Sequence, residues 1–441
     1  MNKQAWMNAA QEKGWESFEI YQSVQKEKGL SWFEGQMDTF EISRVCGTSL
    51  RGVYDSNMAY YASEDIEHED IDSVLEQMAA QAKMITTEDV DQLRQPEDGP
   101  IVVRENHWLA PSMEEVKAVM KSLEEKLLAY DKRVVQVASM GWQEAQSTRE
   151  ITNTNGIEIQ DQEKSQYLVA SIVVSEKDVV KDDYKVEVIH DLKDFDQDTF
   201  VQDLCQKALF KLNAKPIQTM STPVIFEKGA MRQLFSSFLG LFNGELIYKG
   251  ISPLNNKLDT KIFSDQITIV DDPRCLQALS IANYDDEGCP TRRKVLVSKG
   301  VFTKMLHNTK SATRMHALST GNGFKAGYAG SIDVMPMNTY IEPGSVSLEQ
   351  MIENMQNGFV ITDLQGLHAG IDFVTTNFSL QCAGYWVENG QKKHAVSMVT
   401  VAANFMELMN HVEEVGNDME WKYYTSTAPS IRFTSCSISG E

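Results

Sequence analysis

The first half of this sequence carries one pattern twice: short strand-like runs followed by an amphipathic helix. After a helical opening over residues 2–14, ended by Gly14, the first runs carry side chains in the period of two that is typical of strands. The helical spacing of apolar residues over Ile71–Ile85 then predicts a helix that covers one face of an antiparallel meander. The strand runs are Phe18–Val24, Leu30–Phe33, Thr39–Val45 and Thr48–Tyr54, separated by Gly29, Gly35 and Gly47.

The second unit repeats this order after a polar, proline-containing connection over Thr86–Pro111. Ser112 with Glu115 three residues later matches a capping box, which predicts a helix through Tyr130. Strand patterns and a turn then precede another helix, and a proline-containing boundary leads into a long, glycine-punctuated, strand-rich remainder. We therefore predict an α+β protein of three domains, at residues 1–95, 105–214 and 217–441. The later features are the strand region Val134–Ile189, its turn Asn153–Gly156, the helix Asp198–Leu212 and the boundary Lys215–Pro223.

The charge balance and the cysteines exclude several classes of protein. With 41 basic and 63 acidic residues the formal charge is −22, which repels a phosphate backbone and argues against direct nucleic-acid binding. No run approaches the roughly 18 apolar residues of a membrane helix. The six cysteines form no CxxC pair, which argues against a disulfide framework or a thiolate zinc site. A reducing cytoplasm is the expected location.

No motif in the sequence identifies a catalytic centre. A catalytic zinc commonly needs two histidines one helical turn apart, and none of the eight histidines forms such a pair; His307 and His316 lie nine residues apart. Neither a GxSxG elbow nor a phosphate-binding loop is present. The cluster Asp285, Asp286, Glu287 before Gly288 is open to two interpretations, a cation or proton-transfer site or an ordinary turn, and we favour the turn.

Three stretches resemble the PmbA/TldD family of bacterial peptidase-complex proteins. The most distinctive runs from Ser319 to Trp421 and includes STGNGFKAGYAGSIDV and NGFVITDLQGLHAGIDF. The segment Phe18–Asp65 is similar to the family's first domain, and DDEGCPTRR from Asp285 to Arg293 is similar to its acid-glycine turn and hairpin. The resemblance covers nearly the whole chain and implies the family's α+β fold.

The resemblance also implies how this chain differs from a zinc peptidase. In the TldD branch a helix of the third domain carries His-Glu, three further residues and a second His, which bind zinc and supply the general base. The corresponding segment begins here at Gly229, and it places Ser236, Ser237 and Leu241 at those three positions. Such side chains do not suit zinc. The chain is therefore similar to the PmbA (TldE) branch, for which we expect no catalytic residue, no metal and no cofactor of its own, with zinc in a TldD-type partner.

Three hypotheses about function follow from this resemblance. The leading hypothesis is a metal-free subunit of a heteromeric peptidase that acts on unfolded or extended peptides. For such peptides Asp285, Asp286, Glu287, Asn322 and Gly323 are candidates for a groove, or alternatively for turns. The rivals are a self-sufficient hydrolase near Asp286 and His307, and a non-cleaving regulator or scaffold, in line with the family's label as modulator of DNA gyrase. A homodimer is allowed in the absence of the partner, and neither nucleic acid nor a membrane is expected as a direct partner.

Overall fold

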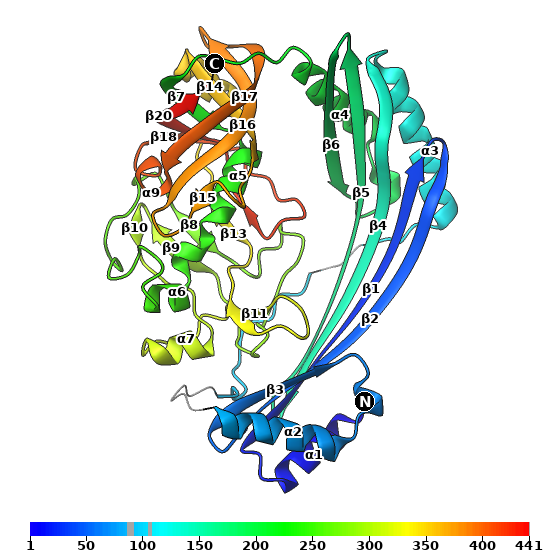
Figure 1. Cartoon of the computed structure of the whole chain (residues 1–441), viewed down its shortest axis with the longest axis vertical. Coiled ribbons are helices and arrows are strands. Elements are labelled where there is room, and N and C mark those ends of the chain that lie inside the picture. The colour runs from blue at the N-terminus through cyan, green and yellow to red at the C-terminus, as the bar shows by residue number, and fades with distance from the viewer. Residues whose placement is uncertain (86–91, 105–107, 441) are drawn as a thin grey trace.

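The computed structural model describes residues 1–85, 92–104 and 108–440. A long, arched sheet stands beside a strand-rich C-terminal domain, and helices cover the two ends of the arch (Figure 1). The mixed, strand-rich architecture confirms the α+β fold predicted from the sequence. None of the helices in the described ranges is long and apolar enough to cross a membrane.

The first unit contains three strands and two main helices, close to the predicted positions. The predicted helices over 2–14 and 71–85 are present with slightly shorter bounds, and Gly14 follows the first with φ of +85°. The elements are α1 Lys3–Glu12, β1 Ser17–Phe33, β2 Gln36–Tyr54, β3 Asn57–Ser63, a 3-10 turn at Ile66–His68 and α2 Ile71–Met84.

The second unit also follows its predicted order. The Ser112 hydroxyl accepts the Glu115 N–H at 3.3 Å, and the Glu115 carboxylate accepts the Ser112 N–H at 2.8 Å, which confirms the capping box. The turn at Asn153–Gly156 joins two long strands, as predicted. The elements are α3 Met113–Tyr130, β4 Val134–Asn153, β5 Glu158–Glu176, β6 Val179–Val188, a 3-10 turn at Leu192–Asp194 and α4 Gln197–Lys211.

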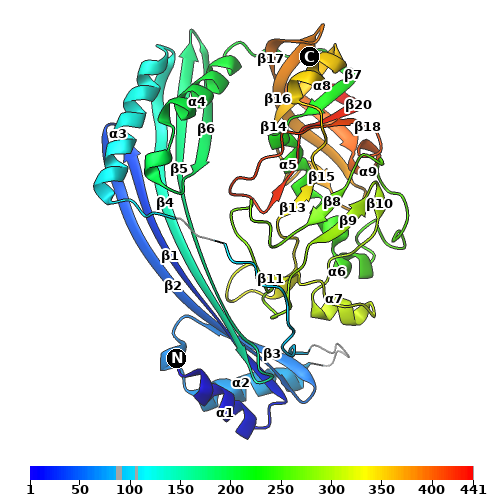
Figure 2. The ribbon, with the colours of Figure 1, turned by 180° about the vertical axis from the view of Figure 1, so that it is seen from behind.

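The strands of the two units form one six-stranded sheet in the order β3-β2-β1-β4-β5-β6. β1 and β4 pair antiparallel from Glu19 opposite Asn153 to Trp32 opposite Met140, so the two units share a continuous hydrogen-bonded ladder. Figures 1 and 2 show that β6 lies toward the C-terminal domain and β2 on the opposite side of the arch.

Two of the three glycines taken as strand boundaries lie inside strands, so the prediction of several short strands was wrong there. Gly29 is within β1 and Gly47 within β2; only Gly35, with φ of +79°, lies in a turn. The reason for Gly47 is a close approach, because a Cβ at this position would lie 2.0 Å from Cγ of Tyr328. Gly47 thus makes room for an aromatic ring from the C-terminal domain.

The C-terminal domain is built around a sheet that closes on itself. β7, β14, β16, β17 and β20 are hydrogen-bonded in a circuit, because β14 pairs with both β7 and β16. A second sheet has the order β10-β9-β8-β13-β19, and β11 with β12 forms a separate hairpin.

The elements of this domain are β7 Met220–Phe226, α5 Lys228–Ser237, a 3-10 turn at Leu239–Phe242, α6 Gly244–Tyr248, β8 Ile269–Asp271, β9 Lys294–Ser298, β10 Val301–Phe302, α7 Thr309–Arg314, β11 Gly323–Lys325, β12 Ile332–Val334, β13 Thr339–Ile341, α8 Leu348–Met355, β14 Gly358–Gln365, β15 Ile371–Asp372, β16 Asn377–Glu388, β17 Gln391–Asn404, α9 Phe405–Leu408, β18 Val412–Val415, β19 Ser426–Thr427 and β20 Ile431–Ser439.

The connection between the two N-terminal units runs along the surface of the C-terminal domain. Its described residues form no helix or strand, and residues 86–91 and 105–107 lie outside the described ranges. The Val102 backbone exchanges two hydrogen bonds with the Asn283 side chain, at 2.8 and 3.0 Å. The Arg104 guanidinium donates to the carbonyls of Ala278 and Leu279. The described residues of this connection thus form a strap on the C-terminal domain.

Candidate functional site

The acidic cluster forms a tight turn. The Gly288 N–H donates to the Asp285 carbonyl at 3.1 Å, and Gly288 has φ of +79°, a conformation that glycine adopts readily. One carboxylate oxygen of Asp285 accepts the N–H groups of Glu287 and Cys289, at 3.0 and 2.9 Å. This is turn chemistry of the kind favoured from the sequence.

Two carboxylates of the turn bind the backbone of neighbouring segments. The second oxygen of Asp285 accepts the Gly323 N–H at 2.9 Å. Glu287 accepts the N–H and the hydroxyl of Thr309, at 2.7 and 2.8 Å. A Cβ on Gly323 would lie 2.7 Å from the Glu287 carboxylate, so glycine is needed for this close approach. All three acidic side chains are nearly inaccessible to solvent.

Asp286 joins the turn to the long sheet. Its carboxylate forms an ion pair with Arg149 of β4 at 2.7 Å and accepts the Lys325 N–H at 2.7 Å. The same guanidinium pairs with Asp161 of β5 and donates to the Tyr284 carbonyl at 2.9 Å. The arginine that completes the cluster lies 137 positions before Asp286, and nothing in the sequence pattern marked it.

The β11–β12 hairpin makes the second contact with the sheet. The Lys325 ammonium donates to the Ser49 hydroxyl at 2.5 Å and lies 4.6 Å from the centre of the Tyr21 ring. The Tyr328 hydroxyl donates to Glu64 at 2.9 Å. Burial, together with the nearby charge of Arg51, lowers the pKa of Lys325 to about 8, against the opposing charges of Asp286 and Glu19.

Asn322 belongs to a separate buried network. Its amide donates to Asp271 at 3.1 Å and to the Met335 carbonyl at 2.9 Å, and its oxygen accepts the Thr320 hydroxyl at 2.9 Å. The Lys294 ammonium lies 3.0 Å from the same Asp271 carboxylate. Asn322 therefore fixes the loop before β11, and Asp271 and Lys294 are buried polar residues that the sequence patterns did not single out.

Burial raises the pKa of two carboxyl groups in the turn, those of Asp285 and Glu287. Burial raises the pKa of Asp285, the neighbouring Glu287 carboxylate raises it further, and three backbone N–H donors oppose the rise. Burial also raises the pKa of Glu287, against the opposing charge of Arg51. These carboxyl groups already serve the backbone and are closed to solvent, so a substrate would reach them only after the turn had moved.

His307, the histidine considered for a hydrolase, and His316 lie in different surroundings. His307 is buried, its Nδ1 lies 3.1 Å from the Ser311 hydroxyl, and its ring packs against Gly244. His316 is exposed. Burial lowers the pKa of His307 to about 4, so the imidazole is neutral near pH 7.

The three positions aligned with the zinc motif lie in different surroundings. Ser236 is exposed near the end of α5, and the Ser237 hydroxyl donates to the Gln233 carbonyl of its own helix at 3.0 Å. Leu241 lies beyond α5 in the 3-10 turn and is fully buried in the main core. The single continuous helix expected from Gly229 is thus three short elements. Two hydroxyls and a leucine do not fit a zinc ion.

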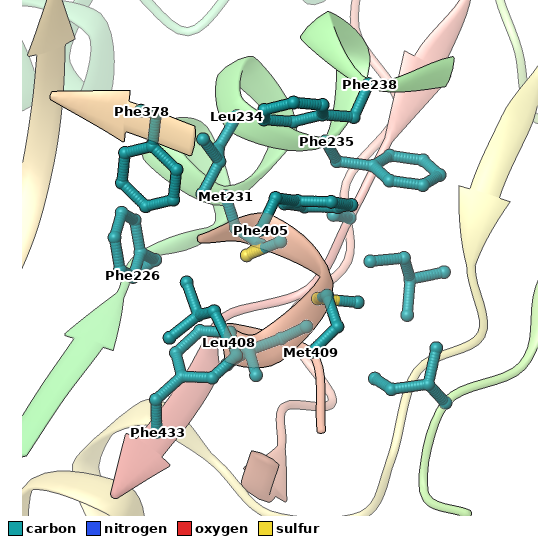
Figure 3. Packing of buried hydrophobic residues seen from close by; sticks show 14 of the residues in the cluster. Phe226, Met231, Leu234, Phe235, Phe238, Phe378, Phe405, Leu408, Met409 and Phe433 are labelled. Atoms are coloured by element: carbon teal, nitrogen blue, oxygen red, sulfur yellow. The ribbon is translucent and has the colours of Figure 1, made fainter. Parts of the chain in front are cut away.

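The buried face of α5 is apolar and tightly packed. Figure 3 shows Met231, Leu234 and Phe235 pointing into the same cluster as Phe405 of α9. The rings of Phe238 and Phe405 stack with centroids 4.3 Å apart. Across the described residues, no group of three or more His, Cys, Asp or Glu side chains is arranged to hold a metal ion.

The closed sheet, the arched sheet and their helices together form a strand-rich α+β protein. Three domain families match the chain: PmbA/TldA metallopeptidase domain 1 at residues 18–82, the central domain at 106–212 and the C-terminal domain at 219–440. The chain belongs to the PmbA/TldD family, as the resemblance of its sequence predicted.

Individual relatives agree with this assignment. Metalloprotease PmbA of Escherichia coli O157:H7 is 28% identical over 316 residues, which cover 71% of this chain and 67% of that protein. TldE from Thermococcus kodakarensis superposes with a TM-score of 0.88 at 25% identity, over 99% of this chain and 100% of that one. A Thermotoga maritima MSB8 protein described as a modulator of a DNA gyrase has a TM-score of 0.89 at 25% identity, over 99% of both chains.

Burial of neutral His307 predicts a specific loss of stability in acid. The pKa of His307 is 6.5 in its ordinary state and about 4 in the folded protein. At pH values between 4 and 6.5 the unfolded chain therefore binds more protons than the folded one. The stability that the neutral His307 side chain contributes is present above pH 6.5 and is lost as the pH falls toward 4. We expect His307 to account for roughly 2 kcal/mol of the fall in unfolding free energy between about pH 7 and about pH 5.

Urea unfolding of the wild type, His307→Gln and His368→Gln at these two pH values measures this effect. The pH dependence should shrink in His307→Gln and stay unchanged in His368→Gln, whose position is exposed. An equal pH dependence in all three proteins would contradict the burial argument.

Proposed function

We propose that this chain is a metal-free partner subunit of a heteromeric zinc metallopeptidase, in which a TldD-type paralogue carries the zinc. The observation that carries the proposal is the α5 segment, where the aligned positions hold Ser236, Ser237 and Leu241. A catalytic zinc needs three protein ligands and one open position for water. Membership of a metallopeptidase family together with this missing ligand set favours a supporting role over independent catalysis.

The packing of α5 supports an architectural role for that helix. Its buried face lies against α9, with Phe238 stacked on Phe405. Restoring a histidine at Leu241 would place an imidazole in the apolar core, where an unpaired polar group is costly. The side chains of this segment therefore pack into the core, and we expect the segment to contribute a rigid structural element to the complex.

A cleft between the six-stranded sheet and the C-terminal domain supports the proposal that the complex acts on extended peptides. It has a volume of about 850 Å³, and β6 forms one side of it. The opposite side carries Leu276–Leu279 and the segment Glu420–Lys422, and the strap residues Val103 and Arg104 also line it. Its volume lies within the usual range for ligand sites.

The edge of β6 that lines this cleft has free backbone groups. In the described sheets β6 pairs only with β5. Glu176 and Val179 flank a two-residue turn and therefore form a hydrogen-bonded pair. Because the N–H and C=O groups of successive residues point to opposite sides of a strand, those of odd-numbered β6 residues face β5 and those of even-numbered residues point away from it. The Lys211 ammonium reaches the outward Asp182 carbonyl at 3.3 Å, in agreement with this pattern. Val186 and Val188 are then the outward residues within the cleft.

Backbone pairing at this edge suits an unfolded substrate. An added strand is held by main-chain hydrogen bonds, which are largely independent of its sequence. The exposed side chains of Val103 and Leu276 offer apolar contacts beside it. The cleft is thus a better candidate for peptide binding than the buried acidic turn, whose residues Asp285, Asp286 and Glu287 hold the fold together. A cytoplasmic location is part of the same proposal.

Hydrolysis of an unstructured protein tests the proposed division of labour. We expect no turnover by the purified chain, turnover when the zinc-bearing paralogue from the same cell is added, and loss of that turnover with a chelator. The complex should also form at micromolar concentration. Chelator-resistant activity of this chain alone would favour a self-sufficient hydrolase, and tight peptide binding without turnover in the mixture would favour the scaffold role.

The β6 edge predicts a selective effect of proline. Val186→Pro removes an outward N–H inside the cleft, whereas Val180→Pro removes an equivalent N–H on the same edge outside it. We expect Val186→Pro to weaken binding of an extended, fluorescently labelled peptide about 10-fold, the effect of losing roughly one hydrogen bond. Val180→Pro should bind as the wild type does. Equal affinities for all three proteins would place the peptide elsewhere.

A further inference from the structure

One loop of the C-terminal domain lies between the cleft and the six-stranded sheet. We call residues 275–281 the cleft loop. Leu276 lines the cleft and keeps 58% of its surface exposed. Leu279 lines the cleft as well as a second, smaller pocket of about 160 Å³, which is bordered by β1, β4 and β5. The position of the cleft loop on the sheet therefore sets the width of the cleft opposite β6.

Charged side chains hold the cleft loop from two sides. On one side the Arg104 guanidinium of the strap donates to three carbonyls of the loop. On the other side the Glu163 carboxylate of β5 accepts the Ile281 N–H at 2.9 Å. Among the described residues, no other side chain of the six-stranded sheet forms a hydrogen bond with the loop. Glu163 is thus the polar contact that holds the loop against the sheet.

The Glu163 carboxyl lies among charges of both signs. Arg149 forms its ion pairs with Asp161 and Asp286, and Arg104 donates to carbonyls. Glu163 therefore has no ion-pair partner within the described part of the chain. The charged and titratable groups around it are Lys26 and Glu27 of β1, Arg149 of β4, Asp161 and Lys164 of β5, Arg104 of the strap and the Cys275 thiol of the cleft loop.

The protonation of Glu163 is coupled to the position of the loop. Burial raises the pKa of Glu163 to about 7. The nearby Asp161 carboxylate adds to the rise, whereas the Ile281 N–H and the charges of Arg149 and Arg104 oppose it. Once the loop has left the sheet, water reaches the carboxyl and its pKa returns toward the ordinary value of 4.5.

The sign of this coupling follows from the proton balance. At pH values between 4.5 and 7 the protein with the loop held binds more protons than the protein with the loop released. The held state is therefore favoured most below pH 4.5 and loses stability as the pH rises through 7. A carboxylate makes the stronger hydrogen bond to Ile281, but its burial without a paired cation costs more than this gain.

We infer that Glu163 is a positioning residue for the cleft, which holds the cleft loop against the sheet while it is protonated and releases it when it loses its proton. The adjoining pocket lies beside the carboxyl and gives water room to hydrate the ionised form. The link to peptide binding rests on the proposed function of the cleft, whereas the contact between Glu163 and the loop does not.

Hydrogen exchange at the cleft loop tests the pH-dependent contact without any peptide. After correction for the intrinsic effect of pH, we expect protection of the Ile281 amide to fall about 10-fold between about pH 6 and about pH 8, as the two pKa values require. In Glu163→Gln the side-chain oxygen still accepts the N–H but does not titrate, so protection should stay constant. Glu158→Gln, at an exposed position of the same strand, should behave as the wild type does.

Two exchange results would overturn the inference. One is constant protection of the wild-type Ile281 amide over this pH range. The other is an equal fall of protection in Glu163→Gln, which would assign the pH dependence to another group.

Peptide affinity tests what the contact does for the cleft. At about pH 6, Glu163→Ala should bind an extended, fluorescently labelled peptide about 5-fold more weakly than the wild type, because a released loop must be ordered again on binding. Glu163→Gln should restore the wild-type affinity. Equal weakening by both variants would overturn the positioning role. Wild-type affinity in Glu163→Ala, together with the expected exchange result, would support the pH-dependent contact and contradict the proposed peptide site.

Discussion

The ion pair between Arg149 and Asp286 is the contact on which the relation between the two halves of the molecule depends. It lies where β4 and β5 of the long sheet meet the acid-glycine turn of the C-terminal domain. Asp286 is 4% exposed, and the guanidinium is also bound by Asp161 and by the Tyr284 carbonyl. Removing Arg149 would leave the buried Asp286 carboxylate without its ion-pair partner, which is among the most destabilising changes that one substitution makes. Removing Asp286 would still leave the guanidinium paired with Asp161.

With the sheet held in this position, its two edges face different surroundings. β6 borders the cleft beside the C-terminal domain, and the outer half of β2 faces solvent. The backbone groups along the outer edge of β6 are the ones proposed to pair with an extended peptide. The α5 segment packs its apolar face into the main core, and Leu241, just beyond α5, is buried there as well.

Local patterns in the sequence predicted local structure well, including the capping box at Ser112 and the turn at Asp285–Gly288. They failed where a contact is distant in sequence. Gly47 looked like a strand boundary because its partner, the Tyr328 ring, belongs to another domain. For the same reason the pairing of Glu19 with Asn153, and of Arg149 with Asp286, had no signal in any short window. The resemblance to a family predicted the overall fold, but it did not indicate that β6 and the outer half of β2 lack a strand partner along one edge.

A double-mutant cycle on Arg149 and Asp286 tests the central claim that this ion pair fixes the sheet to the C-terminal domain. The free energy of unfolding would be measured for Arg149→Met, Asp286→Asn and the double variant, with the exposed pair Lys117 and Glu114 as a reference. Arg149→Met should cost about 3–5 kcal/mol, Asp286→Asn should cost less because Asp161 still pairs with Arg149, and the double variant should cost clearly less than the sum of the two. Losses below about 1 kcal/mol, as expected for the exposed pair, would contradict the account.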